Sequence, residues 1–283
     1  MENQQTYTTH ITAKTGWFDL NLRELWQYRD LVLLFVKRNY TTRYKQTILG
    51  PLWLIFNPLI TVSLYALVFG GIAGLPTDGV PQFAFYLASN ALWSYFAICI
   101  TQTASTFTAN AGVMGKVYFP RMVMPLSAVI TGIFDLLIQV IMLAVVVVVY
   151  NLRGAGMSVG EGLLLAPVLV LQTGLLGLGF GIIIASLTTK YRDLAILVTF
   201  GVQLWMYASP VVYSTSQLTG SRLYGVYMCN PMAPVLAAWR YGTLGTPTFD
   251  ALYYGISWVT TLAVLFVGIV LFNRIEKTFM DTV

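Results

Sequence analysis

The chain has 283 residues, of which 57% are hydrophobic and only 10% are charged; its mean hydropathy is +0.71. Soluble domains usually contain about a quarter charged residues, so this composition excludes an ordinary soluble fold and predicts a membrane protein. The net charge of +5 requires no nucleic acid, because basic groups beside a membrane are attracted to anionic lipid headgroups.

Residues 1–21 form a polar, Thr-rich cytoplasmic segment without the apolar core of a signal peptide, so the first span is expected to direct insertion itself. The spacing of Asn21 and Glu24 fits a capping box that starts a helix at Leu22. Residues 22–50 then combine an apolar face that includes Trp26 with a basic run, which is typical of an amphipathic helix in the membrane interface. This segment is either a simple anchor or a basic rim that receives an anionic headgroup.

Six charge-poor windows follow, and each is long enough for a transmembrane helix of about 20 residues. A β-barrel is not expected, because runs such as Val145–Val149 do not alternate apolar and polar residues. The predicted fold class is all-α integral membrane: a six-span domain over residues 51–273 and a cytoplasmic tail, 274–283. The spans are expected near 52–73, 83–107, 123–150, 163–187, 194–213 and 251–273.

The second window carries no charge but mixes hydroxyl and amide side chains with aromatic rings. The polar groups could form hydrogen bonds between helices, or they could line a path for a hydroxyl-rich solute. Aromatic faces suit a sugar, whose ring has apolar C–H faces, but aromatic residues also form interfacial belts. Composition leaves these interpretations open.

Asp135 is the one ionisable residue well inside an expected span, and Gln139 lies one turn later on the same face. Such a carboxylate is either a functional group or a packing group that pairs with a neighbouring helix or subunit; pairing is favoured. Ion-coupled transport is poorly supported, because the single His lies at position 10. Cys99 and Cys229 give neither a disulfide framework nor metal-ligand spacing.

The connection over residues 214–249 is too long for a tight turn and too apolar for a free linker. Its short apolar segments are broken at Asn230, Pro231 and Pro234. A re-entrant pair of short helices between the fifth and sixth spans, able to close the outer mouth of a path, fits this pattern.

The Lys and Arg residues predict the orientation. With six spans, 13 of the 16 lie on the side of the two termini. The positive-inside rule therefore places both termini in the cytoplasm.

Catalytic motifs are absent from the sequence. Gly115–Lys116 is followed by Val117 rather than Ser or Thr, so there is no phosphate-binding loop, and no acidic cluster suits Mg²⁺. We therefore expect no enzyme activity, cofactor or metal in this chain. Energy for uphill transport must then come from another chain, received at the cytoplasmic loops Thr108–Met122 and Thr188–Asp193.

From about residue 20 to the end, several blocks resemble, in order, the membrane subunits of type-2 ABC exporters. The likeness is closest to the O-antigen polysaccharide permeases (Wzm-like), with capsule and teichoic acid permeases as near relatives. The blocks are Tyr44–Trp53 with Asn57–Pro58, Lys116–Arg121 with Pro125–Ser127 and Asp135, Tyr191–Asp193, Gln203–Tyr213, Asn230–Pro231 with Arg240, and Glu276–Phe279 with Asp281.

The resemblance implies a homodimer with two copies of an ABC ATPase that binds ATP and Mg²⁺. The complex would be an ATP-driven translocase in a bacterial inner membrane, surrounded by membrane lipids, and no nucleic acid is implied. The substrate would be a polysaccharide on polyprenyl diphosphate. The implied residues are Arg38 and Arg43 for the diphosphate; Tyr65, Trp93, Tyr95, Phe96, Trp205 and Tyr207 for the channel; and Lys116, Tyr118, Phe119, Arg121, Tyr191 and Arg192 for ATPase coupling.

Three other functions remain open from the residues. A related permease for drugs or small lipids is not excluded by the composition of the spans. An integral membrane sugar transferase is disfavoured by the missing acidic cluster. A bare channel or scaffold is disfavoured by loops that resemble coupling elements.

Overall fold

The computed structural model describes residues 22–45, 47–114, 116–117, 119–157, 161–188 and 194–278. In these ranges every regular element is a helix and there is no β-strand, so the expected all-α class is confirmed. Five stretches are long and apolar enough to cross a membrane, and the chain is a multi-pass membrane protein. They are Gly50–Ile72, Gln82–Ala104, Val123–Leu152, Gly162–Thr188 and Ala251–Arg274.

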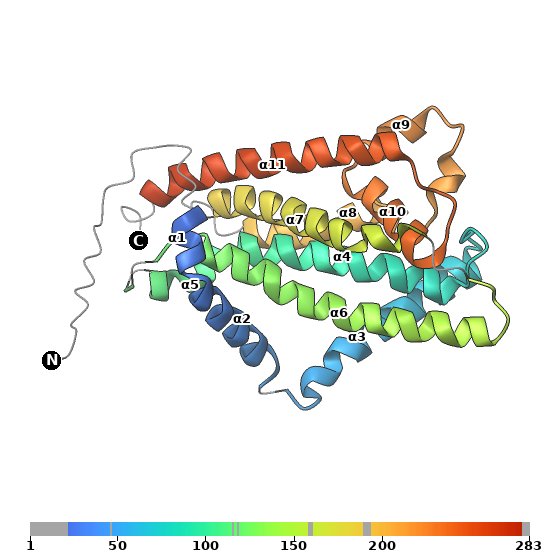
Figure 1. The fold of residues 1–283 in the computed structure, drawn as a ribbon, viewed down its shortest axis with the longest axis horizontal. Coiled ribbons are helices and arrows are strands. Elements are labelled where there is room, and N and C mark those ends of the chain that lie inside the picture. Colours follow the sequence, from blue (N-terminus) through green and yellow to red (C-terminus); the bar gives the residue numbers. More distant parts are fainter. Residues whose placement is uncertain are drawn as a thin grey trace.

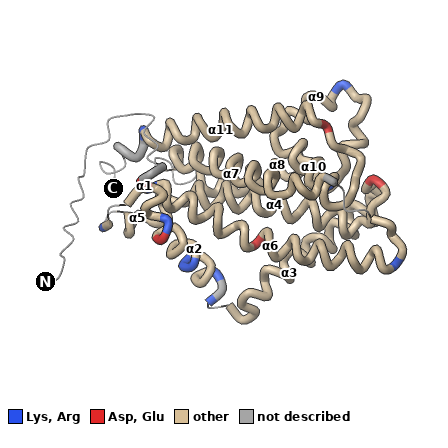
Figure 2. Tube along the Cα trace, in the orientation of Figure 1, with Lys and Arg blue, Asp and Glu red and all other residues tan. Residues whose placement is uncertain are grey.

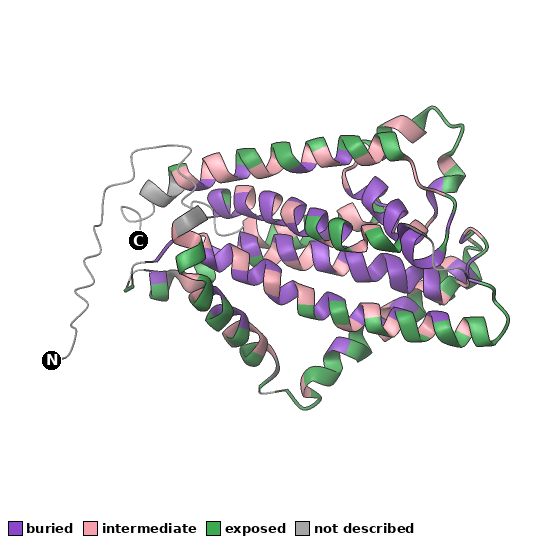
Figure 3. Ribbon diagram, viewed as in Figure 1, coloured by how far each residue is buried: buried purple, intermediate pink, exposed green. Residues whose placement is uncertain are grey.

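The helix α4 (Gln82–Ala104) lies at the centre of the bundle, with 78% of its apolar window buried inside the protein. α6 (Val123–Leu152) and α7 (Ala166–Thr188) pack along α4, and α11 (Ala251–Thr278) packs against α7. Figure 1 shows these four helices running side by side along the long axis. Buried residues concentrate on α4 and α7, whereas α6 and α11 each expose an apolar side (Figure 3). Such an exposed apolar side is what a helix presents to lipid.

Glycines allow α7 to approach α4 closely, because small residues let helix backbones meet. A Cβ placed on Gly177 would lie 2.5 Å from the Cβ of Cys99, and one on Gly181 would lie 2.5 Å from the Cβ of Thr103. Rotating a side chain relieves neither contact, because a Cβ is fixed to its backbone. The α4–α7 distance therefore depends on these two glycines.

We expect Gly177→Ala to lower the thermal stability of the purified protein, at an overpacking cost of roughly 1–3 kcal/mol. Gly255→Ala on α11 is the matched control, because nothing lies within 4 Å of the added methyl group. Thermal unfolding of both variants in the same detergent measures the difference. Equal unfolding midpoints would contradict this account of the α4–α7 contact.

The first span is the least buried, with 17% of its window inside the protein. It begins with the 3-10 turn η1 (Gly50–Leu52), continues as α3 (Trp53–Tyr65) and ends in the π-helical segment η2 (Ala66–Ile72). π-Helical segments are rare and often lie at functional sites. This span is therefore a candidate border of such a site.

The fifth expected span differs most from its prediction over residues 194–213. The described helix α8 (Leu194–Tyr207) has 14 residues, which is about 21 Å at 1.5 Å per residue. Pro210 follows its end, and proline both lacks an amide hydrogen and disfavours helical backbone before it. The chain then turns through Ser209 and Val211, both 0% exposed. Irregular backbone is tolerated at membrane depth where protein buries it.

Two helices precede the first span. α1 (Leu22–Gln27) begins where the capping box predicts, although Asn21 lies outside the described residues. α2 (Arg29–Tyr44) packs on α6 through a buried strip that includes Phe35. Leu33 and Leu34 on its other face are 60% and 59% exposed, which leaves an apolar surface for the membrane interface.

Basic residues gather at one end of the bundle. Figure 2 shows Lys and Arg along α2 and beside α5 (Thr106–Met114), with almost no charge in the middle. The exception in the middle is the single acidic residue of α6, Asp135.

The prediction of a loop over Thr108–Met122 is wrong for the first part of that range. There the chain forms the helix α5, which begins one residue after the end of α4.

Candidate functional site

A cavity of about 610 Å³ opens between α3, α4, α6 and α8. We call it the aromatic cavity. It brings together aromatic and polar side chains that the sequence places far apart. Its lining includes Trp53, Tyr65, Asn90, Trp93, Asp135 and Gln139.

Four polar groups from three helices meet at this cavity. Nη1 of Arg43 on α2 donates to Oδ2 of Asp135 at 2.5 Å, and Nδ2 of Asn90 on α4 donates to Oε1 of Gln139 at 3.1 Å. The Asp135 side chain is 6% exposed and the Arg43 side chain 32%. Asp135 thus pairs with a neighbouring helix, the arrangement favoured from the sequence. Its partner is one of the two arginines expected to meet the headgroup.

A second cavity, of about 560 Å³, lies between α2, α5 and α6 and shares Arg43 with the first. We call it the polar cavity. Among the described residues that line it there is no Asp or Glu. A cationic cavity of this kind suits an anionic group rich in oxygen atoms. Its guanidinium, amide and hydroxyl lining includes Arg38, Arg43, Gln102, Asn110, Ser127 and Thr131.

Arg38 is held on the polar-cavity face of α2. Its Nη2 donates to Oδ1 of Asn110 on α5 at 2.7 Å, and its guanidinium lies 4.6 Å from the ring centroid of Phe35. Arg38 and Arg43 are five positions apart, a turn of about 140° around the helix, and both long side chains line the polar cavity. The structure therefore brings both arginines to one cavity, and their contact with a headgroup stays a prediction.

The six aromatic residues expected along a channel do not share one surface. Tyr65 and Trp93 line the aromatic cavity. The Trp205 ring packs behind them, 6.4 Å from Trp93 and 5.2 Å from Phe96 between centroids. Phe96 is 0% exposed, whereas Tyr207 is 53% exposed. Only the first two reach this cavity, and the channel role of the set stays a prediction.

Tyr95 points away from the aromatic cavity, toward α6 and α7. A Cβ on Gly174 would lie 2.6 Å from its hydroxyl oxygen, and one on Gly132 would lie 3.1 Å from its ring. Two positions along a helix correspond to a turn of about 200°, so Trp93 and Tyr95 lie on opposite sides of α4. Tyr95 therefore packs between α4, α6 and α7 and does not line the aromatic cavity.

The coupling residues are only partly described. Lys116 is exposed, Phe119 is 5% exposed and Arg121 is 9% exposed. Phe119 packs on Phe35 of α2, with ring centroids 5.8 Å apart. This segment therefore contacts the helix that carries Arg38 and Arg43. Tyr118, Tyr191 and Arg192 lie outside the described residues.

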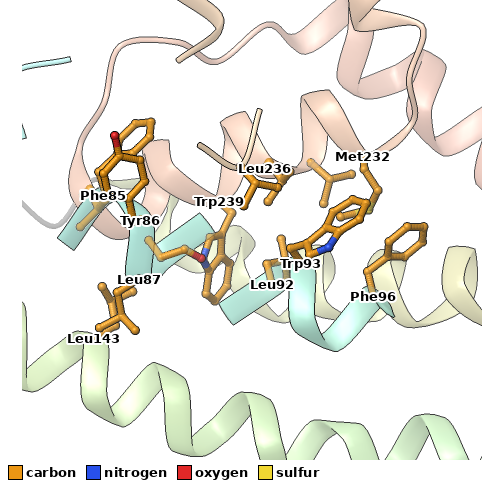
Figure 4. Close-up of a cluster of buried hydrophobic side chains, with 14 of the residues drawn as sticks. Phe85, Tyr86, Leu87, Leu92, Trp93, Phe96, Leu143, Met232, Leu236 and Trp239 are labelled. Atoms are coloured by element: carbon orange, nitrogen blue, oxygen red, sulfur yellow. The ribbon is translucent and has the colours of Figure 1, made fainter. Parts of the chain in front are cut away.

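The connection over residues 214–249, which we call the outer connection, contains two short helices, α9 (Leu223–Met228) and α10 (Met232–Leu244). They are separated at Asn230 and Pro231, as the sequence predicts. α10 is almost wholly buried, and Nε1 of Trp239 donates to the carbonyl of Ala88 on α4 at 3.0 Å. Figure 4 shows Met232, Leu236 and Trp239 of this helix among the apolar side chains of α4. α10 is therefore part of the core, and its role as a gate stays a prediction.

Asn230 joins the end of α8 to the start of α10. Its Oδ1 accepts from Nε1 of Trp205 at 3.1 Å, and its Nδ2 donates to the carbonyl of Ala208 and to Oγ of Ser209 at 3.1 Å and 2.9 Å. One amide thus satisfies polar groups of the irregular turn after α8. The sequence indicated Asn230 as a break between short helices and as part of a resemblance block, but not as a hydrogen-bonding group.

Asn230→Ala is expected to lower the thermal stability of the purified protein by roughly 1–3 kcal/mol, since it removes a partner of the buried Ser209 hydroxyl and of the part-buried Trp205 indole. Gln217→Ala is the control, because Gln217 is an exposed amide in the same outer connection. Thermal unfolding in detergent distinguishes them. If the Asn230→Ala protein were as stable as the wild type, the turn would not need this amide.

Arg240 is the largest fully buried side chain, and it enters the sequence reasoning only through the resemblance. Nη1 donates to the carbonyl of Pro210 and, at 3.2 Å, to Oγ of Ser89. The guanidinium lies 4.6 Å from the centroid of the Phe85 ring. Arg240 therefore ties α10 both to α4 and to the turn after α8. The sequence feature that could have indicated this role is a single arginine within an apolar segment.

Hydroxyl groups link the other outer segments. Tyr227 on α9 donates to the hydroxyl of Tyr213 at 2.8 Å, which donates to the carbonyl of Tyr207 at 3.1 Å. Burial raises the pKa of Tyr213 and Tyr227, so both phenols stay protonated and able to donate. The hydroxyl of Ser216 donates to Asp78, in the loop after the first span, at 2.6 Å.

Metal ligation has no support in the described ranges, where no group of three or more His, Cys, Asp or Glu could hold an ion. The chemistry that both cavities offer is binding. It consists of hydrogen bonds, cationic contacts and aromatic faces.

Known proteins resemble this chain over most of its length. The family model described as ABC-2 type transporter matches residues 30–244. Two proteins of Klebsiella pneumoniae, both described as "O-antigen export system permease protein RfbA", are 27% identical over 254 and 257 residues, which is 89% of this chain and 94% of each relative. A Myxococcus xanthus protein of the same description is 28% identical over 225 residues, covering 77% of this chain and 82% of its own length.

Proposed function

The chain belongs to the ABC-2 type transporter family, and from that premise we propose that it is the permease subunit of an O-antigen exporter in a bacterial inner membrane. The proposed substrate is a polysaccharide on polyprenyl diphosphate, moved from the cytoplasmic to the outer leaflet. The observation that carries the proposal is that two relatives described as O-antigen export permeases match 89% of the chain and 94% of their own length.

The polar cavity supports the diphosphate part of the substrate. Arginine guanidinium groups bind phosphate oxygens with paired, charge-assisted hydrogen bonds. Arg38 and Arg43 both line this cavity, with no described carboxylate in its lining. α2 also exposes apolar leucines, so the helix offers a place for the headgroup and a surface for lipid.

The aromatic cavity supports the glycan part. Trp53, Tyr65 and Trp93 offer ring faces, and Asn90 and Ser94 offer amide and hydroxyl groups. A long neutral glycan must slide, so many weak stacking contacts serve it better than a few strong bonds that would hold it in place. Aromatic faces tolerate successive sugar units of different orientation.

An exporter of this family takes its energy from a separate subunit, because the membrane subunit is not an ATPase. We place two copies of this chain with two copies of an ABC ATPase that binds ATP and Mg²⁺. Movement of the ATPase would reach the segment around Lys116–Arg121. The contact of Phe119 with Phe35 would then pass it to α2.

The test is reconstitution of the chain with an ABC ATPase in proteoliposomes. We expect lipid-linked glycan to stimulate ATP hydrolysis and to move across the membrane when ATP is supplied. Hydrophobic drugs and glycan without lipid should do neither. Stimulation by drugs alone would instead support a drug or small-lipid permease.

A further inference from the structure

Arg43 lies where the two cavities meet, because its side chain lines both. Asp135 lines only the aromatic cavity, and Arg38 lines only the polar cavity. The ion pair with Asp135 therefore holds Arg43 toward the aromatic cavity. A ligand in the polar cavity would contact Arg38 together with an arginine that already has a carboxylate partner.

The carboxylate of Asp135 is only half satisfied. Oδ2 accepts from Arg43, while Oδ1 is buried and has no hydrogen-bond partner within the described part of the chain. Within the ion pair, the Arg43 side chain is 32% exposed and the Asp135 side chain is 6% exposed. Arg43 is thus the more accessible partner, and another anion can approach it from the polar cavity.

A released Asp135 would have a second partner on its own helix. Gln139 lies one turn along α6, and Gln–Asp pairs at this spacing form favourable contacts. Its Oε1 already accepts from Asn90, so its amide nitrogen is the end left to donate. The polar groups around Asp135 therefore allow two arrangements, with Arg43 on the carboxylate or away from it.

We propose that Asp135 is a specificity-determining counter-ion, which an anionic headgroup must displace from Arg43 before it can bind Arg38 and Arg43 together. This inference rests on the proposed function and names a role for Asp135 in it. An anion must outcompete a carboxylate, so a diphosphate with several charges succeeds where a phospholipid with one charge fails. The membrane around the protein is full of such phospholipids, and two arginines without a counter-ion would bind them.

The inference distinguishes Asp135 from a packing group. A packing group would stabilise α2 on α6 and leave the affinity for anionic lipid unchanged. A counter-ion weakens the binding of every anion at Arg43 by the cost of its displacement, and a singly charged lipid, whose own binding is weak, then no longer fills the site. Removing its charge should therefore strengthen lipid binding enough for singly charged lipids to occupy the site.

The experiment uses the complex with its ATPase subunit in nanodiscs of phosphatidylcholine, titrated with polyprenyl diphosphate and, separately, with phosphatidylglycerol. Asp135→Asn is expected to bind phosphatidylglycerol about tenfold more tightly, the effect of roughly one charge-assisted hydrogen bond. It should also bind polyprenyl diphosphate more tightly, because the displacement cost is removed for both ligands. Asp135→Glu is the control, because it keeps the counter-charge and should bind phosphatidylglycerol about as weakly as the wild type.

Asp135→Ser is the second neutral variant in case Asp135→Asn does not assemble. A serine hydroxyl here can return to the carbonyl one turn back, as Thr131 does to Ser127 at 2.6 Å. A wild-type complex that prefers diphosphate, with neutral variants that bind phosphatidylglycerol no more tightly than the wild type, would overturn the counter-ion role and leave the proposed function standing. A wild-type complex without any preference would overturn both.

Discussion

Arg38→Gln is expected to reduce export of lipid-linked glycan about tenfold or more, because it removes a charge-assisted contact with the diphosphate. The amount of assembled complex should not change. Arg38 donates to the neutral amides of Asn39 and Asn110, so no buried carboxylate loses its cation. ATP-driven export by proteoliposomes, per assembled complex, measures the effect.

The matched control is Lys37→Gln, which removes one positive charge from the adjacent position of α2. Lys37 is exposed and does not line the polar cavity, whereas Arg38 does. If export depended only on the net charge of this end of the bundle, both variants would lose it equally. Such an equal loss would contradict a headgroup site at Arg38.

Arg43 is less suitable for a single substitution. Arg43→Gln would leave Asp135 buried without its cation, and breaking a buried ion pair costs roughly 3–5 kcal/mol. A loss of export would then not separate headgroup binding from assembly. The double variant Arg43→Gln with Asp135→Asn removes both charges and keeps a pair of amides that can bond to each other.

The spans were predictable because bilayer thickness imposes a length, and charge-free windows of that length can be read along the chain. α8 is the exception, since hydropathy does not distinguish a helix from a buried turn. The segment after it stays apolar through Val211 and Val212. The position of Pro210 was the signal that the helix ends early.

The candidate site was predictable by residue type but not by pairing. Arg43 and Asp135 are 92 positions apart, and no local pattern indicates that α2 packs on α6. A buried carboxylate requires a cation, so the nearby basic run could have suggested a partner of this kind. The separation of Trp93 from Tyr95 needed no structure, because helical periodicity already places them on opposite sides of α4.

Trp93→Leu is expected to slow glycan export about tenfold per assembled complex, because it removes the largest aromatic face that α4 presents to the aromatic cavity. Trp93 is 4% exposed and packs on Phe96 and Trp205. The substitution will therefore also lower stability, by roughly 3–5 kcal/mol at most, the cost of a large cavity. Export must be compared with a variant that has a similar stability loss.

Trp239→Leu on α10 provides that comparison. Trp239 is 2% exposed and donates to the carbonyl of Ala88, but it does not line the aromatic cavity. Its replacement removes an indole of the same size and also a hydrogen bond, so less complex should assemble. Each assembled complex should nevertheless export at close to the normal rate. Equal slowing by the two variants would mean that Trp93 acts through packing, and the glycan path would then have to lie elsewhere.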